Sequence, residues 1–133
     1  MKARGSGSII NLSSTAKIMG FPLRSPYAVA KCGVVVLTKS LAMEVSSHGI
    51  RVNAICLRPV LGDRMERVLA QETAARCKPA EEIKAEFTRQ ASLGQWIDPS
   101  KVADIAVFLA SPKARNISGQ FIGVDGNTET LGM

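Results

Sequence analysis

The sequence predicts an α/β fold built on a narrow parallel β-sheet. Short apolar runs bounded by turn residues alternate with longer segments whose apolar residues recur at helical spacing. Strands that alternate with helices in this way pair in parallel, through right-handed crossover connections. The chain of 133 residues is long enough for one domain with one core, yet it supplies only three such strands. Because parallel sheets are normally covered on both faces, we expect these strands to belong to a wider sheet.

Local signals predict the first strand and the first helix. Residues 8–13 form a short apolar run after a Gly/Ser turn, which is typical of a buried strand. Ser25 and Pro26 then predict a helix start, with serine as N-cap and proline at the first helical position. Gly49 is expected to end the helix, because glycine readily adopts the left-handed conformation found there. The apolar residues expected on one face of this helix are Ala30, Val34, Leu37, Leu41 and Val45.

Similar signals predict the remaining elements. Residues 50–56 and 120–124 are apolar runs that predict two further strands. Between them, Pro79 opens the second of two short helical segments. Asp98 and Pro99 form another pair of N-cap and first helical residue, and a longer helix is expected to follow. Its apolar face contains Val102, Ile105, Ala106 and Leu109, and Pro112 stops it.

Composition excludes several classes of protein. Hydrophobic residues make up 46% and charged residues 21%, and no apolar run approaches the roughly 20 residues of a membrane helix. The N-terminus lacks the apolar stretch of a secretory signal, so a cytoplasmic location is expected. The net charge is +6, but the basic residues are scattered and aromatics are only 5%, so no nucleic-acid partner is expected. One histidine and three cysteines without a C-x-x-C pair predict no metal site.

Tyr27, Lys31 and Ser14 are the residues most suited to chemistry. Tyr27 and Lys31 are four apart in the predicted helix, which places their Cβ atoms about 5–6 Å apart on one face. A lysine cation beside a phenol favours the phenolate and lowers the tyrosine pKa from its usual value of about 10, so that the tyrosine can exchange protons near neutral pH. Ser14 follows the first strand, at the edge where open α/β sheets bind ligands. Taken alone, the Tyr-x-x-x-Lys spacing is also that of an ordinary surface pair.

The context of these residues resembles the active-site segment of the short-chain dehydrogenase/reductase family. Ser14 ends a run that begins at Ile9, Tyr27 follows thirteen residues later, and Lys31 comes one helical turn after it. The resemblance covers nearly the whole chain, and the spacings agree without forced gaps. The other segments that carry it are 30–34, 37–42, 49–56, 102–111, 118–120 and 124–126.

The resemblance implies a fold, a reaction and residue roles. The fold is the C-terminal half of a Rossmann-like, doubly wound parallel sheet, which is incomplete in this chain. The reaction is hydride transfer between NAD or NADP and a small-molecule secondary alcohol or ketone. Tyr27 would be the general acid/base, Lys31 would lower its pKa and hydrogen-bond the nicotinamide ribose, and Ser14 would polarise the substrate oxygen. Pro59 and Val60 match the stretch that lies against the nicotinamide.

The resemblance also implies how the chain is divided and how it assembles. Residues 1–133 would form one partial nucleotide-binding domain, within which residues 63–95 are the mobile segment that covers the substrate. The apolar side chains of that segment either line a pocket or form a core. The helix over residues 26–48 pairs with its symmetry mate in the family, which implies a homo-oligomer, and ordinary packing against the sheet is the alternative. The apolar side chains in question are Met65, Val68, Leu69 and Phe87.

Departures from the family leave a second hypothesis open. The family begins with a glycine-rich turn that holds the cofactor pyrophosphate at a helix N-terminus, and no such turn occurs in this sequence. Leu57 and Arg58 stand where the family has Pro-Gly, and Gly62 stands where it has a threonine that contacts the nicotinamide. Either the loop is rebuilt around Arg58, or nicotinamide binding is weakened. The alternative to an enzyme is therefore a catalytically incompetent fragment that acts only in oligomerisation.

Overall fold

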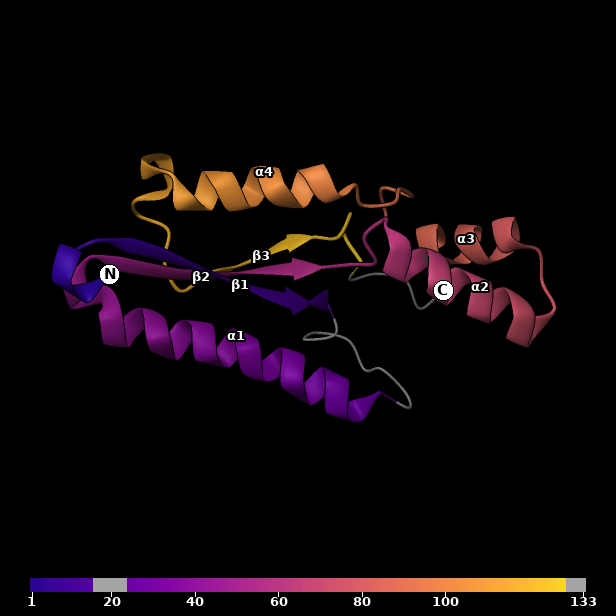
Figure 1. The fold of residues 1–133 in the computed structure, drawn as a ribbon, viewed down its shortest axis with the longest axis horizontal. Coiled ribbons are helices and arrows are strands. Elements are labelled where there is room, and N and C mark those ends of the chain that lie inside the picture. Colours follow the sequence, from indigo (N-terminus) through magenta and orange to yellow (C-terminus); the bar gives the residue numbers. More distant parts are fainter. Residues whose placement is uncertain (16–23, 129–133) are drawn as a thin grey trace.

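The computed structural model describes residues 1–15 and 24–128, which contain a three-stranded parallel sheet (Figure 1). The strands are β1 (Gly7–Ser14), β2 (Ile50–Leu57) and β3 (Phe121–Val124), and they lie in that order. β1 pairs with β2 in parallel, and β2 pairs with β3 in parallel. The predicted α/β class and narrow parallel sheet are therefore confirmed.

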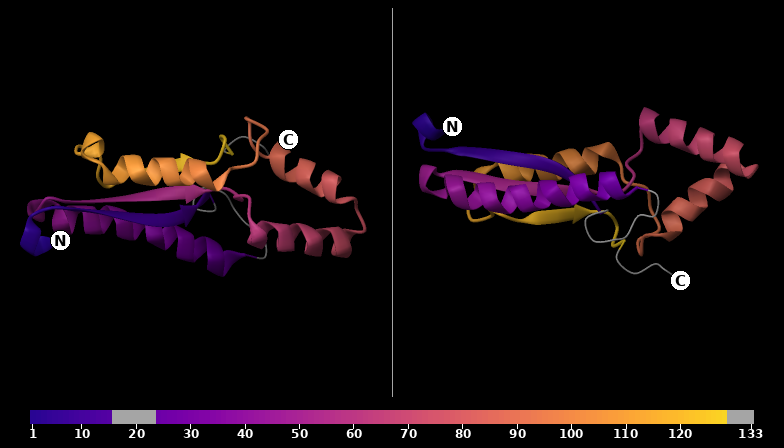
Figure 2. Two further views of the ribbon diagram at one scale, coloured as in Figure 1. Left: turned by 45° about the horizontal axis from the view of Figure 1, so that its top comes forward. Right: turned by 90° about the horizontal axis from the view of Figure 1, so that it is seen from below.

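The helices form two layers and a projecting hairpin. α1 (Ser25–Val45) covers one face of the sheet and α4 (Pro99–Ala110) covers the other (Figure 1). α2 (Asp63–Arg76) and α3 (Ala80–Arg89) form a hairpin beyond the ends of the strands. All three views agree on this arrangement (Figure 2). The hairpin thus lies at the carboxyl edge of the sheet.

The start of α1 differs from the prediction, whereas its end agrees with it. Ser25 is the first helical residue, and Arg24 occupies the N-cap without a side-chain hydrogen bond, so the predicted serine cap is wrong. Pro26 remains in the first turn, where its missing N–H costs no hydrogen bond. After a short 3-10 turn, Gly49 ends the helical stretch with a φ of 63°. A Cβ atom at Gly49 would also collide with the carbonyl oxygen of Gly5. Both the positive φ and this close approach therefore require glycine at position 49.

The buried face of α1 is rotated from the predicted one. Leu37 was expected inside but is 56% exposed. Thr38 is buried instead, because its hydroxyl donates to the Val34 carbonyl oxygen at 2.7 Å and accepts from the Asn11 amide at 2.9 Å. The helix is apolar around most of its circumference, so apolar spacing alone does not select the side that meets the sheet. The buried residues of α1 are Thr38, Ala42 and Val45.

Two apolar clusters flank the sheet, and β2 contributes to both. The cluster on the α1 side contains Ala42, Val45, Ile50 and Val52. The cluster on the α4 side contains Ile55, Leu109 and Ala114. The face of α4 predicted from the sequence packs there, which confirms that prediction. The predicted cap is also confirmed, since the Asp98 carboxylate accepts from the Ser100 backbone N–H at 2.7 Å.

The α2–α3 hairpin has an apolar core of its own. Met65, Leu69 and Ile83 are buried there, and Val68, Phe87 and Trp96 pack against them. The rings of Phe87 and Trp96 lie 5.8 Å apart between centroids. Met65, Val68, Leu69 and Phe87 therefore pack into a core, which was the alternative to lining a pocket.

The described residues also bear on membranes and metals. Within residues 1–15 and 24–128, no helix is long and apolar enough to cross a bilayer. The same residues contain no group of three or more His, Cys, Asp or Glu side chains placed to hold a metal ion.

Candidate active site

The carboxyl ends of the three strands lie in register along one edge of the sheet. Ser14 pairs with Leu57, and Leu57 pairs with Val124, so the last residues of β1, β2 and β3 are aligned. Ser14 is the final residue of β1 rather than the residue after it, and it is half-buried. Open α/β sheets bind ligands outside this edge. The structure therefore places Ser14 at the carboxyl edge of the sheet.

Tyr27 and Lys31 lie on the first turns of α1, beside the end of β1. The Lys31 Nζ atom is 5.9 Å from the centre of the Tyr27 ring and donates to the Leu12 carbonyl oxygen at 3.2 Å. Tyr27 is 39% exposed, so its ring reaches solvent at the edge of the sheet. The lysine thus bridges the helix and the strand, and it holds a cation next to the phenol. Residues 16–23, which connect β1 to α1, lie outside the described residues.

The two neighbouring serines have different surroundings. Ser13 is buried, and its hydroxyl donates to the Lys31 backbone carbonyl oxygen at 2.8 Å. This bond joins β1 to α1 and engages the Ser13 hydroxyl in the interior. Because successive residues of a strand point to opposite faces, Ser14 points away from that contact. The Ser13 hydroxyl is therefore engaged in the contact between β1 and α1, and the two serines lie on opposite faces of the strand.

Pro59 and Val60 continue the same edge after β2. Both are half-buried. Val60 forms an isolated parallel bridge with Ile97, and the Leu61 N–H donates to the Ile97 carbonyl oxygen at 2.9 Å. These contacts fix the start of the connection to α2. The predicted nicotinamide-facing stretch therefore has a defined backbone path at the edge that holds Ser14.

The Arg58 side chain is buried in the loop that follows β2. The Arg58 side chain is 6% exposed and donates a hydrogen bond to the backbone carbonyl oxygen of Phe87 in α3. Burial lowers the pKa of Arg58, and the nearby charge of Asp125 opposes that effect. The guanidinium thus points toward the hairpin.

Two polar side chains of β2 hold the loop that leads into β3. Asn53 is fully buried, donates to the Ile117 carbonyl oxygen at 2.9 Å and accepts from the Gln120 N–H at 3.1 Å. Arg51 donates to the Ile117 carbonyl oxygen of the same loop at 3.3 Å and to the Leu109 carbonyl oxygen of α4 at 2.6 Å. These roles were not foreseen, although a polar residue within an apolar strand is a signal that could have indicated them. By fixing this loop, both residues help to place β3 in the carboxyl edge.

Comparison with known proteins identifies the family. A family model described as enoyl-(acyl carrier protein) reductase matches residues 1–127. The chain belongs to the short-chain dehydrogenase/reductase family. The 3-oxoacyl-acyl-carrier-protein reductase of Staphylococcus aureus is 36% identical over 126 residues, which are 95% of this chain and 47% of that protein. A Xanthobacter autotrophicus relative named inactive 2-(S)-hydroxypropyl-CoM dehydrogenase 2 is 36% identical over 131 residues, which are 98% of this chain and 55% of that one.

Solved structures of this dehydrogenase/reductase family match the fold closely. L-sorbose reductase from Gluconobacter frateurii, solved with NADPH and L-sorbose, superposes with a TM-score of 0.90 at 28% identity. The match covers 98% of this chain and 51% of that chain. The chain thus spans about half the length of the relatives it matches. Its three strands are accordingly part of a Rossmann-like sheet, as expected from the sequence.

Proposed function

We propose that the protein is an NAD(P)-dependent oxidoreductase that interconverts a small secondary alcohol and the corresponding ketone. The observation that carries this proposal is the Tyr27–Lys31 pair at the carboxyl edge, with the Lys31 ammonium 5.9 Å from the Tyr27 ring and hydrogen-bonded to β1. The family membership and the neighbour solved with NADPH support it.

The residues of this chain would transfer the proton and orient the substrate. In oxidation, the Tyr27 phenolate accepts the hydroxyl proton of the alcohol, and in reduction the Tyr27 phenol donates a proton to the carbonyl oxygen. The Lys31 ammonium lies 5.9 Å from the centre of the Tyr27 ring, close enough to orient the phenol and the bound ribose. Ser14 donates a hydrogen bond to the reacting oxygen and holds it next to Tyr27. Bound NAD or NADP would supply or accept the hydride.

The residues at this edge fit the nicotinamide end of such a cofactor. Tyr27 and Lys31 offer hydroxyl and ammonium groups to the ribose, and Pro59 and Val60 offer a defined backbone. The large side chain of Arg58 is turned into the interior toward Phe87, so it does not occupy this edge. We therefore expect this loop to allow close approach of the nicotinamide ring.

A single conservative substitution tests the mechanism. Tyr27→Phe removes only the phenolic oxygen, and we expect kcat of the full-length protein to fall roughly 10²-fold or more, as for loss of a general acid/base. Binding of NADH or NADPH, followed by fluorescence, is expected to persist, which separates chemistry from folding. Full activity in Tyr27→Phe would overturn the assignment.

The adjacent serines provide a matched pair of variants. We expect Ser14→Ala to lower kcat strongly. Ser13→Ala removes the hydrogen bond to the Lys31 carbonyl oxygen, so its main effect is a loss of stability of about 1 kcal/mol. Equal losses of kcat in the two variants would argue against a special role for Ser14.

We further propose that α1 joins two copies of the protein. Val29, Val36 and Met43 are spaced seven residues apart along α1 and are 71%, 63% and 81% exposed. A seven-residue apolar repeat is typical of a helix that pairs with another helix. Val36→Glu would place a charge in the middle of this stripe, and we expect it to reduce the mass measured by sedimentation. An unchanged mass in the variant would refute this interface.

A second candidate function is oligomerisation without catalysis. The observation that favours it is the Xanthobacter relative, which is named inactive at 36% identity. This candidate predicts that the full-length protein binds neither NADH nor NADPH yet still self-associates. Cofactor binding together with turnover of any ketone would exclude it.

A further inference from the structure

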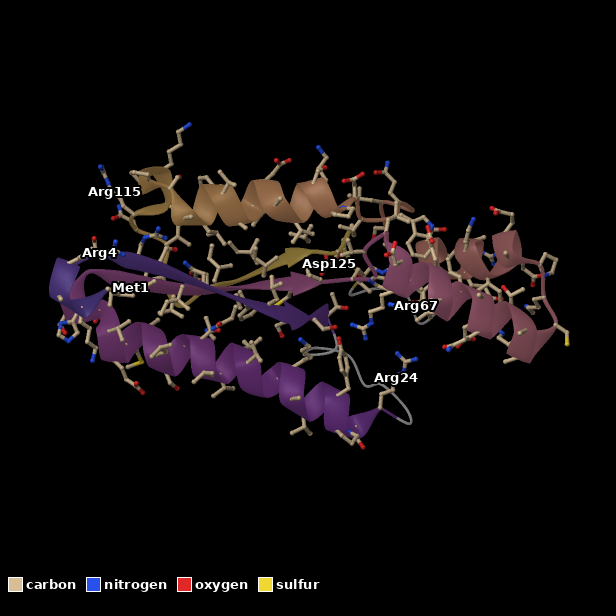
Figure 3. All side chains as sticks on the ribbon, viewed as in Figure 1. Met1, Arg4, Arg24, Arg67, Arg115 and Asp125 are labelled. Atoms are coloured by element: carbon tan, nitrogen blue, oxygen red, sulfur yellow. The ribbon has the colours of Figure 1, made fainter. Side chains whose placement is uncertain are left out.

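Arg58 is a buried cation placed between two parts of the molecule. It is the first residue after β2, and only 6% of its surface is exposed. Burying a guanidinium carries a large desolvation cost, so its surroundings must supply compensation. The hydrogen bond to the Phe87 carbonyl oxygen and the attraction of Asp125 provide it. Figure 3 places Asp125 at the end of the sheet that faces the hairpin, whereas Arg115 lies at the opposite end.

The acceptor of this hydrogen bond belongs to the last turn of a helix. Phe87 lies two residues before Arg89, the last residue of α3 (Ala80–Arg89). The last four carbonyl groups of an α-helix have no partner within the helix, and their partial negative charge attracts cations. Arg58 therefore caps α3 from outside the hairpin, through a contact between residues 29 apart in sequence.

The hairpin has few other attachments to the sheet. Its apolar core is its own, and the ribbon shows it beyond the strand ends rather than over a face of the sheet (Figures 1 and 2). Backbone contacts hold its two ends, through Val60 with Ile97 and through Ser92 with Asn127. Arg58 adds a third attachment, which is its hydrogen bond to the Phe87 carbonyl oxygen of α3. It is thus well placed to fix the angle at which the hairpin projects.

We propose that Arg58 is a positioning residue, which fastens the α2–α3 hairpin to the carboxyl edge of the sheet. That this hairpin covers the substrate is expected from the family resemblance and rests on the proposed function, whereas the fastening rests on the contacts alone. Arg58 follows Leu57, the β2 residue that pairs with Ser14, so its contact with Phe87 holds α3 at the edge of the sheet where β1 and β2 end.

Hydrogen exchange tests the fastening directly. Arg58→Met keeps most of the buried length but removes the donors, and Arg58→Lys keeps the charge. In the full-length protein we expect Arg58→Met to speed amide exchange in residues 80–89 roughly tenfold, as for loss of a strong helix cap. Exchange in residues 50–57 is expected to stay unchanged, and Arg58→Lys should give an intermediate rate. Arg89→Gln removes a cation from the same last turn, but Arg89 is exposed and its charge is screened by water. This variant is the matched control, and it should speed exchange in residues 80–89 much less than Arg58→Met does.

Two outcomes of the exchange experiment would overturn the proposal. One is unchanged exchange in residues 80–89 of Arg58→Met. The other is equal acceleration in residues 50–57 and 80–89, which would mean that Arg58 only stabilises the fold. If amide exchange in residues 80–89 of Arg58→Lys stays as slow as in wild type, the positive charge is what fastens α3.

Kinetics then test positioning of the substrate cover. We expect Arg58→Met to raise KM for the alcohol or ketone several-fold while kcat changes less, because the proton-transfer residues are untouched. Unchanged KM despite a loosened hairpin would overturn the positioning role. If the wild-type protein shows no activity with either cofactor, the proposed function fails, but the exchange result still decides whether Arg58 fastens the hairpin.

Discussion

The sheet and the α2–α3 hairpin are stabilised in different ways. The central strand β2 is covered on both faces, and Val52, Ala54 and Ile55 are fully buried in it. The hairpin buries only three apolar side chains. Its outer surface is held instead by ion pairs, such as Arg76 with Glu86 at 2.7 Å and Lys78 with Glu86 at 2.9 Å.

This difference indicates that the hairpin opens more readily than the sheet. Segments with few buried apolar contacts unfold locally at a lower free energy than the core of a domain. Exposed ion pairs add little, because water and salt screen them. Ser14 lies at the end of β1, in the stable sheet, whereas the hairpin expected to cover the substrate is the labile part. The molecule thus combines a well-packed sheet with a hairpin held by a few specific contacts.

The largest expected effect is from a cavity in the sheet. Ile55 is fully buried in the central strand, among residues of α4 and the neighbouring strands. Ile55→Ala is expected to lower the free energy of unfolding of the whole chain by about 2–5 kcal/mol. Urea denaturation followed by circular dichroism measures this loss. A change below about 1 kcal/mol would mean that the sheet is not the cooperative core.

The same substitution in the hairpin should act locally. Ile83 is also fully buried, but in the small hairpin core. Ile83→Ala is expected to open the hairpin at lower urea while the circular dichroism transition of the sheet shifts little. Trp96, the single tryptophan, packs on Phe87 and reports the hairpin by fluorescence. Coincident transitions with the same shift as in Ile55→Ala would show that hairpin and sheet unfold as one unit.

Elements set by local interactions were predictable from the sequence, whereas features set by contacts between distant segments were not. The strands were predictable, because a buried parallel strand is a short apolar run in any context. The start of α4 was predictable because the Asp98 cap is a local interaction, satisfied two residues away at Ser100. By contrast, the buried side of α1 depends on where β1 lies, and Thr38 turns inward only because Asn11 meets it there.

In the candidate site, too, features set by local sequence were predictable and features set by distant contacts were not. The Ser14, Tyr27 and Lys31 set was recognisable by spacing and by resemblance, although the position of Lys31 over the Leu12 carbonyl oxygen was not. The departure at Arg58 was visible in the sequence, but the direction of its side chain was not. That direction depends on Phe87, which lies 29 residues further along the chain. Contacts over such a separation have no local signal in the sequence.

The smallest effect is expected when acid protonates Glu86 and so breaks the ion pairs of the hairpin. The hydrogen bond from Arg76, followed by the one from Lys78, lowers the pKa of Glu86 to about 2. A carboxylate with a lowered pKa stabilises the folded state above its unfolded pKa of about 4.3. That contribution is lost as the pH falls from about 4.3 toward 2. Because these groups reach solvent, added salt is expected to weaken the effect.

Trp96 fluorescence between pH 5 and pH 2 measures this contribution in the hairpin. Wild type should lose hairpin structure over this range, and Glu86→Gln should be looser at pH 5 and should change less as the pH falls. Glu81→Gln is the matched control, since Glu81 pairs with Lys84 at 2.9 Å but is 83% exposed. Its titration should match that of wild type. If Glu86→Gln also matches wild type at low salt, the ion pairs do not contribute to closing the hairpin, and its small apolar core and the Arg58 contact remain as the interactions that hold it.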